Sequence, residues 1–283
     1  MSPETGAPRI VHITDERDAR IEDYRSVRDR DLLGPDGRPG LFVGETRLVI
    51  DRMLERPGMT KSVLVERRHA DAMRAAMDAH ALLDVPLFVA DQPILEGIAG
   101  FNVHRGALAI GHRPTSDALA LDRVLPRDGS IRTVLVCEEV RNIDNIGGLY
   151  RNAAAFGVDA VVLSPGCHDH LYRKCLRVSM GHALALPTGR SADWPADLHR
   201  LRADWGLHLI GLATGANART LEACEPPDRV AILVGTEFDG LSDAAIAACD
   251  SIARIPMATG VDSLNVSVAA AVALHRFSRA KRM

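Results

Sequence analysis

The stretch VAILVGTEFDG, residues 230–240, joins an uninterrupted apolar run to a loop with a glycine at each end. Five consecutive apolar residues, from Val230 to Val234, predict a strand buried on both faces, as in a parallel sheet covered by helices. In such sheets, ligands bind at the loops that leave the carboxyl ends of the strands. The loop at residues 235–240 is therefore the first candidate for a binding site.

Similar apolar runs recur through the C-terminal half of the chain. They predict strands at residues 133–136, 160–163, 184–186, 207–212, 230–234 and 252–255. Helical patterns lie between them, including one at residues 145–156. Apolar strands that alternate with helices favour an α/β fold with a parallel sheet.

The N-terminal part predicts a smaller α/β unit. Residues 1–20 are polar and weakly patterned, which is typical of a flexible arm. Strands are predicted at residues 41–43, 62–65, 85–90 and 107–110, and helices at residues 21–31, 47–55 and 69–80. Proline and glycine interrupt the next segment, where a domain boundary fits. The predicted organisation is an arm (1–20), an accessory domain (21–112), a linker (113–129) and a C-terminal domain (130–283).

Length and composition are those of an ordinary globular protein. The chain has 283 residues, of which 47% are hydrophobic and 25% charged, and this length suits two domains. No apolar run is long enough to span a bilayer, and the first residues lack the pattern of a secretion signal, so we expect a cytoplasmic protein without a membrane segment. The five cysteines form no CxxC pair and are expected to be reduced thiols.

The overall charge does not indicate nucleic-acid binding. The net charge is −3, whereas a nucleic-acid-binding domain is usually basic. Of the 34 basic residues, only Lys61, Lys174 and Lys281 are lysines. Arginine suits bidentate phosphate contacts, although genome composition explains an arginine-rich chain equally well. Charge alone leaves the question of an RNA partner open.

Two further loops carry unusual residues at predicted strand ends. In the first, NIDNIGGLYR at residues 142–151, Asn145 and Arg151 lie on either side of a glycine pair; the third is IPMATGVDSLN at residues 255–265. Taken singly, these residues could serve as helix caps and turns. Their occurrence in order, each at a strand end, favours one shared ligand site. The chain has no GxGxxG, GxxxxGK[ST] or HExxH motif, so a Rossmann, P-loop or zincin site is unsupported.

The patterns N-x-G-x-x-x-R, G-x-E-x-x-G and I-P-M…S-L-N-V-S-V-A resemble the three motifs of the SpoU (TrmH-like) family in the SPOUT superfamily. The resemblance covers residues 131–279. Enzymes of this family methylate ribose 2′-hydroxyls of ribosomal or transfer RNA with S-adenosyl-L-methionine. The resemblance therefore implies this reaction and cofactor, a C-terminal domain with a deep trefoil knot, and a homodimer.

The resemblance also implies roles for individual residues. Arg151 is expected at the hydroxyl, with Asn145 and Glu237 positioning Arg151 or the loop backbone. Ser263 and Asn265 are expected to shape the third loop and hold the ribose. The predicted cofactor-binding residues are Gly235, Ile255, Leu264, Leu163, Thr214 and Met257. Two positions depart from the family pattern: Phe238 replaces a frequent glycine, and Gly260 comes one place later than in many members.

The N-terminal unit resembles an accessory RNA-binding domain related to a small ribosomal protein. The segments FVGE at residues 42–45 and RGALA at residues 105–109 carry this weaker match, in which Gly44 and Glu45 invert the usual order. It favours ribosomal RNA over transfer RNA as the partner.

Three other interpretations fit the sequence less well. A non-enzymatic RNA-binding or ribosome-assembly factor on the same fold predicts damage to Arg151, Glu237 or Asn265, and all three are present. A SPOUT enzyme that methylates a base would fit a different third motif better. A hydrolase lacks the GxSxG nucleophile elbow. The run CHDH at residues 167–170 predicts no metal site, because adjacent side chains rarely converge on one ion.

Overall fold

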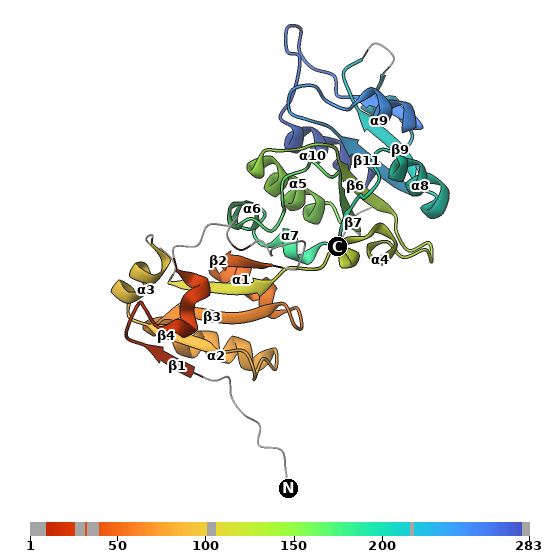
Figure 1. The fold of residues 1–283 in the computed structure, drawn as a ribbon. Coiled ribbons are helices and arrows are strands. Elements are labelled where there is room, and N and C mark those ends of the chain that lie inside the picture. The colour runs from red at the N-terminus through yellow and green to blue at the C-terminus, as the bar shows by residue number, and fades with distance from the viewer. Residues whose placement is uncertain (1–9, 26–31, 33–39, 101–105, 216–217, 279–283) are drawn as a thin grey trace. The chain divides into compact units, whose positions relative to one another are not determined.

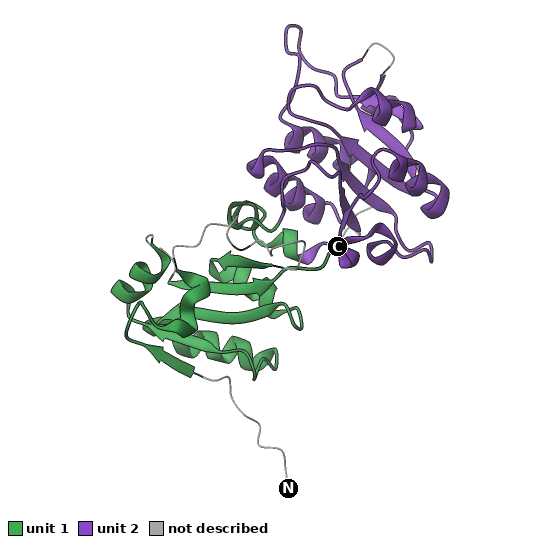
Figure 2. Cartoon of the chain, viewed as in Figure 1, with its two compact units in different colours: residues 1–115, 171–184 green, residues 116–170, 185–283 purple. Residues whose placement is uncertain are grey.

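The computed structural model describes residues 10–25, 32, 40–100, 106–215 and 218–278. Contacts within the chain divide it into two compact units (Figure 2). The N-terminal unit comprises residues 1–115 and 171–184, and the C-terminal unit comprises residues 116–170 and 185–283. The segment 171–184, which the sequence assigned to the C-terminal domain, therefore belongs with the N-terminal unit.

The N-terminal unit contains a five-stranded mixed sheet in the order β1-β4-β3-β5-β2. Its strands are β1 (Ile10–Ile13), β2 (Leu41–Glu45), β3 (Thr60–Glu66), β4 (Leu87–Ala90) and β5 (Ala107–His112). Its helices are η1 (Ala19–Tyr24), α1 (Arg47–Leu54), η4 (Arg67–His69), α2 (Ala70–Ala79), α3 (Gln92–Ala99) and α6 (Arg173–Val178). Strand β4 runs parallel to β1 and β3, whereas β5 is antiparallel to β2 and β3. The predicted small α/β unit is thus present, with a mixed sheet.

The predicted arm contains a strand of this sheet. Residues 10–13 pair with β4 as β1, and their side chains alternate between exposed and buried. Val11 and Ile13 enter the core, since alternate residues of a strand face the same side of the sheet. A strand of four residues is too short to stand out in a polar segment. The predicted helix at residues 21–31 appears as the 3₁₀-helix η1, and its second part, 26–31, lies outside the described residues.

The C-terminal unit is built on a seven-stranded sheet in the order β10-β12-β9-β11-β6-β7-β8, and every pair is parallel. Its strands are β6 (Thr133–Cys137), β7 (Ala160–Leu163), β8 (Thr188–Arg190), β9 (His208–Leu212), β10 (Arg219–Thr220), β11 (Val230–Val234) and β12 (Ser251–Arg254). Its helices are η5 (Asp117–Leu119), α4 (Leu121–Val124), α5 (Ile143–Ala155), α8 (Ala196–Trp205), η6 (Leu221–Ala223), α9 (Asp243–Ala248) and α10 (Val266–Phe277). The parallel sheet predicted from the apolar runs is confirmed.

Helices cover both faces of this sheet (Figure 1). Helices α5 and α10 lie on one face, and α8 and α9 lie on the other. The second face packs into a core centred on Trp205, Leu198 and Leu201 of α8. Among the described residues, no helix has both the length and the apolar character required to cross a membrane.

Two sequence predictions differ from the structure. Residues 184–186 are predicted as a strand, but residues 184 and 185 form the end of the short helix α7 (His182–Ala185). The strand β8 begins only at Thr188. A three-residue apolar window does not distinguish a buried helical turn from a strand. Residues 113–129, predicted as a linker, contain α4, and Leu121 and Leu125 are buried in the core of the unit. Their apolar side chains anchor the segment despite its prolines and glycine.

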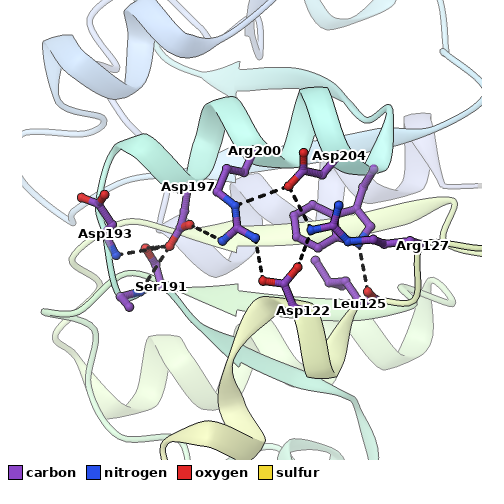
Figure 3. A network of polar contacts seen from close by, with 10 residues as sticks. Asp122, Leu125, Arg127, Ser191, Asp193, Asp197, Arg200 and Asp204 are labelled. Carbon is purple, nitrogen blue, oxygen red and sulfur yellow. Dashed lines mark hydrogen bonds and ion pairs between the residues drawn. The ribbon is translucent and has the colours of Figure 1, made fainter.

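A network of ion pairs ties α4 and the following loop to α8 (Figure 3). The Arg200 guanidinium donates to the carboxylates of Asp122, at 2.6 Å, and Asp197, at 3.0 Å. Arg127 reaches Asp204 at 3.1 Å. Both guanidinium groups lie over the Trp205 ring, 4.9 Å and 5.4 Å from its centroid for Arg127 and Arg200. The Trp205 indole N–H donates to the Leu125 carbonyl at 2.9 Å, so the ring is held in place from several sides.

Asp197 should contribute a pH-dependent part of the stability of the C-terminal unit. Burial by itself would raise the pKa of Asp197, but hydrogen bonds from Ser191 and Arg200 outweigh burial and lower that pKa. A lowered pKa gives stability that is fully present above the ordinary aspartate pKa of about 3.9 and is lost as the pH falls through the lower folded value. Urea unfolding should therefore show Asp197→Asn to be less stable than wild type at pH 7, with the gap narrowing toward pH 3. Asp71→Asn, which alters a side chain that is 97% exposed, should change little at either pH; a gap independent of pH would contradict this role.

Candidate active site

A cleft opens in the C-terminal unit at the carboxyl ends of β9, β11 and β12, with a volume of about 840 Å³. Because these strands are neighbours in a parallel sheet, the loops that follow them meet at one edge. The cleft is lined by the residues after β9, by the second loop (235–240) and by much of the third loop (255–265). Eight predicted site residues line it: Thr214, Gly235, Glu237, Ile255, Met257, Ser263, Leu264 and Asn265.

The second loop is a tight turn that requires glycine at its first position. The Thr236 N–H donates to the Gly240 carbonyl at 2.8 Å, which closes the turn. A Cβ atom on Gly235 would lie 2.0 Å from that same carbonyl oxygen and 2.3 Å from the Leu241 nitrogen. Gly240 has a φ of +72°, a conformation that favours glycine. The turn is therefore fixed by backbone contacts.

Asn145 connects the three motif segments. It lies in the first turn of α5 (Ile143–Ala155), so most of the predicted first loop, residues 142–151, is helical. Its side-chain Nδ2 donates to Glu237 Oε1 at 2.9 Å, and its Oδ1 accepts from Asn265 Nδ2 at 2.8 Å. Asn145 is only 7% exposed, so these hydrogen bonds satisfy an amide that would be costly to bury without partners. One side chain from each loop thus joins a continuous chain of hydrogen bonds.

Two helices begin at this network. Asn142 Oδ1 caps α5 by accepting from the Asp144 N–H at 2.8 Å, and Asn265 Oδ1 caps α10 by accepting from the Ser267 N–H at 3.0 Å. Glu237 Oε1 also accepts from the Asn142 N–H, at 3.2 Å. A carboxylate is favoured at a helix N-terminus, where the helix dipole is positive. Glu237 therefore stabilises both the N-terminus of α5 and the side chain of Asn145.

The first and third loops are also held by close packing of α5 against α10. A Cβ on Gly148 would lie 2.9 Å from Ser267 Oγ and 3.0 Å from Ser267 Cβ. One turn further along α5, Asn152 Nδ2 donates to the Ser267 carbonyl at 2.7 Å. The second glycine of the pair in the first loop therefore allows a close helix contact.

Comparison with known proteins identifies the family. The sequence model of the SpoU rRNA Methylase family matches residues 132–275. An uncharacterized tRNA/rRNA methyltransferase of Mycobacterium bovis is 38% identical over 276 residues, covering 95% of this chain and 92% of that protein. The chain belongs to the SpoU family.

Solved structures share the fold of this SpoU protein over nearly its whole length. The AdoMet-bound rRNA methyltransferase from Sinorhizobium meliloti is 21% identical, with a TM-score of 0.75, over 94% of this chain and 97% of that chain. An RNA 2′-O ribose methyltransferase is 25% identical, with a TM-score of 0.69, over 94% and 97% of the two chains. The prediction of a SpoU-type RNA methyltransferase is confirmed.

Two predicted residues of the SpoU protein lie apart from the cleft. Arg151 is exposed on α5 and does not line the cleft, and its guanidinium forms no hydrogen bond or ion pair with the part of the chain that the structure describes. An α-helix turns about 100° per residue, so Arg151 points about 120° away from Asn145. Leu163 is fully buried at the end of β7, and β6 separates its strand from β11. Asn145 and Glu237 therefore hold each other and the loop backbone, and neither side chain is hydrogen-bonded to Arg151.

Sequence reasoning missed two polar residues that support the site. One is Asn142, the cap described above, whose signal was an asparagine directly before a helical pattern. The other is Glu138, which is 4% exposed at the end of β6. Its carboxylate accepts from Trp194 Nε1 at 2.8 Å and from the Ser242 N–H at 2.8 Å. Because Ser242 caps α9 directly after the second loop, Glu138 fixes where that loop ends.

Cys167 and His170, at the two ends of the CHDH run, both make packing contacts within the C-terminal unit. The Cys167 thiol donates to the Cys137 carbonyl at 3.1 Å, and burial raises the pKa of this thiol. The His170 ring stacks on the buried Tyr150 ring, with centroids 5.6 Å apart. Within the described ranges, no group of three or more histidine, cysteine, aspartate or glutamate side chains is arranged to hold a metal ion.

Gly235 should tolerate no side chain. We expect Gly235→Ala to destabilise the C-terminal unit by about 1–3 kcal/mol, because the backbone of residues 240 and 241 must move to admit the methyl group. Hydrogen exchange should accelerate at the Thr236 amide. Gly215 provides the matched control: it lines the same cleft, and a Cβ there would meet nothing within 4 Å. Equal effects of Gly215→Ala and Gly235→Ala in urea unfolding would refute the close contact.

Proposed function

We propose that this protein transfers a methyl group from S-adenosyl-L-methionine to a ribose 2′-hydroxyl of ribosomal RNA. The observation that carries the proposal is the hydrogen-bonded chain Glu237–Asn145–Asn265, which joins the three motif loops beside the cleft. The similar protein from Sinorhizobium meliloti is an rRNA methyltransferase with AdoMet bound, and another similar structure is an RNA 2′-O ribose methyltransferase. The resemblance of the accessory domain to a ribosomal protein favours ribosomal RNA over transfer RNA.

The cleft fits the proposed cofactor. Its volume of about 840 Å³ lies within the range of about 300–1,000 Å³ typical of small-molecule pockets. Ile255, Met257 and Leu264 would contact apolar parts of the cofactor, and Gly235 also lines the cleft. Thr214 would add a hydroxyl at the end of β9. S-adenosyl-L-methionine supplies a methyl group on a sulfonium centre, which is electrophilic.

The protein's own residues would bind, orient and stabilise charge. A ribose hydroxyl is a poor nucleophile, so it must be held in line with the methyl group and lose its proton. Arg151 lies outside the cleft of its own chain, so a second copy of the chain would bring its Arg151 to the hydroxyl. There the guanidinium would stabilise the developing alkoxide electrostatically, with a substrate phosphate accepting the proton. Ser263 and Asn265 would hold the ribose, and the hydrogen bonds of Asn145 and Glu237 would keep the loops in register.

The homodimer and the trefoil knot implied by the family resemblance are part of this proposal. Support for a dimer comes from α10, where Val268 and Val272 are 48% and 38% exposed. Residues four apart lie on the same face of a helix, so together they form an apolar strip. Leu264, in the loop that leads into α10, is 41% exposed. A second copy of the chain is the partner that we propose for this strip.

Labelled methyl transfer tests the reaction. Ribosomal RNA from a strain that lacks the gene should accept labelled methyl groups from S-adenosyl-L-methionine, and mapping should locate them on one 2′-hydroxyl. RNA from the parent strain is the control and should accept few, because its site is already modified. Cofactor binding without any transfer to RNA would favour a ribosome-assembly factor, and label on a base would favour a base methyltransferase.

Arg151 should affect turnover without affecting cofactor binding. We expect Arg151→Ala to lower kcat by about 10²–10³-fold, as for loss of one group that stabilises a developing oxyanion. The Kd for S-adenosyl-L-methionine, measured by calorimetry, should stay unchanged because Arg151 does not line the cleft. Arg123→Ala, which removes a comparably exposed arginine from α4, should leave both values unchanged. Near-normal transfer by Arg151→Ala would refute the role of this residue.

A further inference from the structure

Phe238, at the tip of the second loop, is the most exposed of the large hydrophobic side chains in the described ranges. It is 97% exposed, whereas the other eight exposed ones retain 38–49% of their surface. Leaving a phenyl ring in water forgoes the free energy of burial. Phe238 nevertheless belongs to the residues that line the cleft, so its ring stands at the rim of the proposed active site.

The turn holds the backbone that carries this ring in a fixed position. The Thr236 N–H bonds to the Gly240 carbonyl at 2.8 Å, and the Asp239 N–H bonds to Thr236 Oγ1 at 2.9 Å. The preceding residue, Glu237, is held by Asn145 on the inner side of the loop. Binding to a side chain on a pre-ordered turn costs less conformational entropy than binding to a mobile one.

The charges around the ring restrict what it can bind. Phe238 lies between two carboxylates, Glu237 and Asp239, and the loop 235–240 has no basic residue, whereas Arg254, the last residue of β12, lines the cleft. The loop itself therefore offers no cationic partner to a phosphate group. A neutral, flat and apolar surface remains as the favoured contact, and the face of a nucleobase has these properties. Aromatic side chains stack on bases of single-stranded RNA in this way, independently of sequence.

We propose that Phe238 stacks on an unpaired nucleobase of the RNA, next to the ribose that enters the cleft. This inference rests on the proposed function, since it assumes that an RNA ribose is the substrate. The adenine of the cofactor is a less favourable partner, because a ring that stacked on it inside the cleft would be partly covered by the cleft walls. The base adjoining the target nucleotide must then be unstacked from its neighbours, which favours a loop or single-stranded segment as the target.

Kinetics of Phe238→Ala and Phe238→Trp test the proposal, with ribosomal RNA from a strain lacking the gene as substrate. Phe238→Ala should raise the KM for RNA by about 5- to 150-fold, the equivalent of ~1–3 kcal/mol for one stacked base, and leave kcat unchanged. Phe238→Trp keeps an aromatic face and should retain a KM near that of wild type. Leu48→Ala is the matched control, since it truncates a 48% exposed side chain on α1 and should change neither value.

Three other results would overturn the proposal. An unchanged KM for RNA in Phe238→Ala would exclude stacking. A raised Kd for S-adenosyl-L-methionine without a change in RNA binding would assign the ring to the cofactor. A fall in molar mass by light scattering would assign it to contact between copies of the chain.

A binding measurement separates this inference from the proposed function. Fluorescence polarisation with a labelled single-stranded oligouridine should show weaker binding by Phe238→Ala than by wild type, and no difference with an oligomer of the same length that lacks bases. Phe238→Trp adds a third tryptophan to the native Trp194 and Trp205. Oligouridine should quench the tryptophan fluorescence of this variant more than that of wild type. If wild type transfers no methyl group but this difference persists, the function fails and the stacking stands. If wild type methylates RNA and the variants behave alike, only the stacking fails.

Discussion

The hydrogen-bonded amide of Asn145 is the constraint on which the active-site region depends. It donates to Glu237, 92 residues away in sequence, and accepts from Asn265, 120 residues away. An amide can do both at once, whereas a carboxylate has no proton to donate and an ammonium group has no lone pair to accept with. Because Asn145 is nearly buried, its amide has one favoured orientation. Flipping the amide would place its oxygen against the Glu237 carboxylate and its NH2 group against the NH2 group of Asn265. Three segments that are far apart in the sequence are therefore held in one fixed arrangement.

Other features of the C-terminal unit maintain this geometry from outside the network. Asn142 and Asn265 start α5 and α10 at the network, and Gly148 lets these helices approach each other. Glu138 fixes the end of the second loop through Ser242. These contacts are made on folding, so the loops are ordered before a ligand binds. Pre-ordered polar groups are also a main source of transition-state stabilisation in enzymes.

The sequence predicted the parallel sheet and the loops at its edge because both follow from local patterns. A run such as 230–234 is apolar throughout only if both faces are buried, and ligand loops follow the carboxyl ends of such strands. Features that depend on tertiary contacts could not be predicted from local patterns. The separation of Arg151 from Asn145 depends on helical phase, and the burial of Leu163 depends on strand order, which chain order does not give. The role of Glu138 depends on Ser242, 104 residues away in sequence. The capping role of Asn142 is local, whereas its contact with Glu237, 95 residues away, is not.

The assignment of residues 171–184 to the N-terminal unit has a consequence for how the two units can be separated. The chain leaves the C-terminal unit after β7, contributes α6 to the N-terminal unit, where it packs beside β2 and its Arg177 pairs with Glu45, and returns before β8. The units are therefore joined by three covalent passages, at residues 115/116, 170/171 and 184/185. By these contacts the N-terminal unit is discontinuous in sequence. A cut after residue 115 would separate α6 from β2, its packing partner.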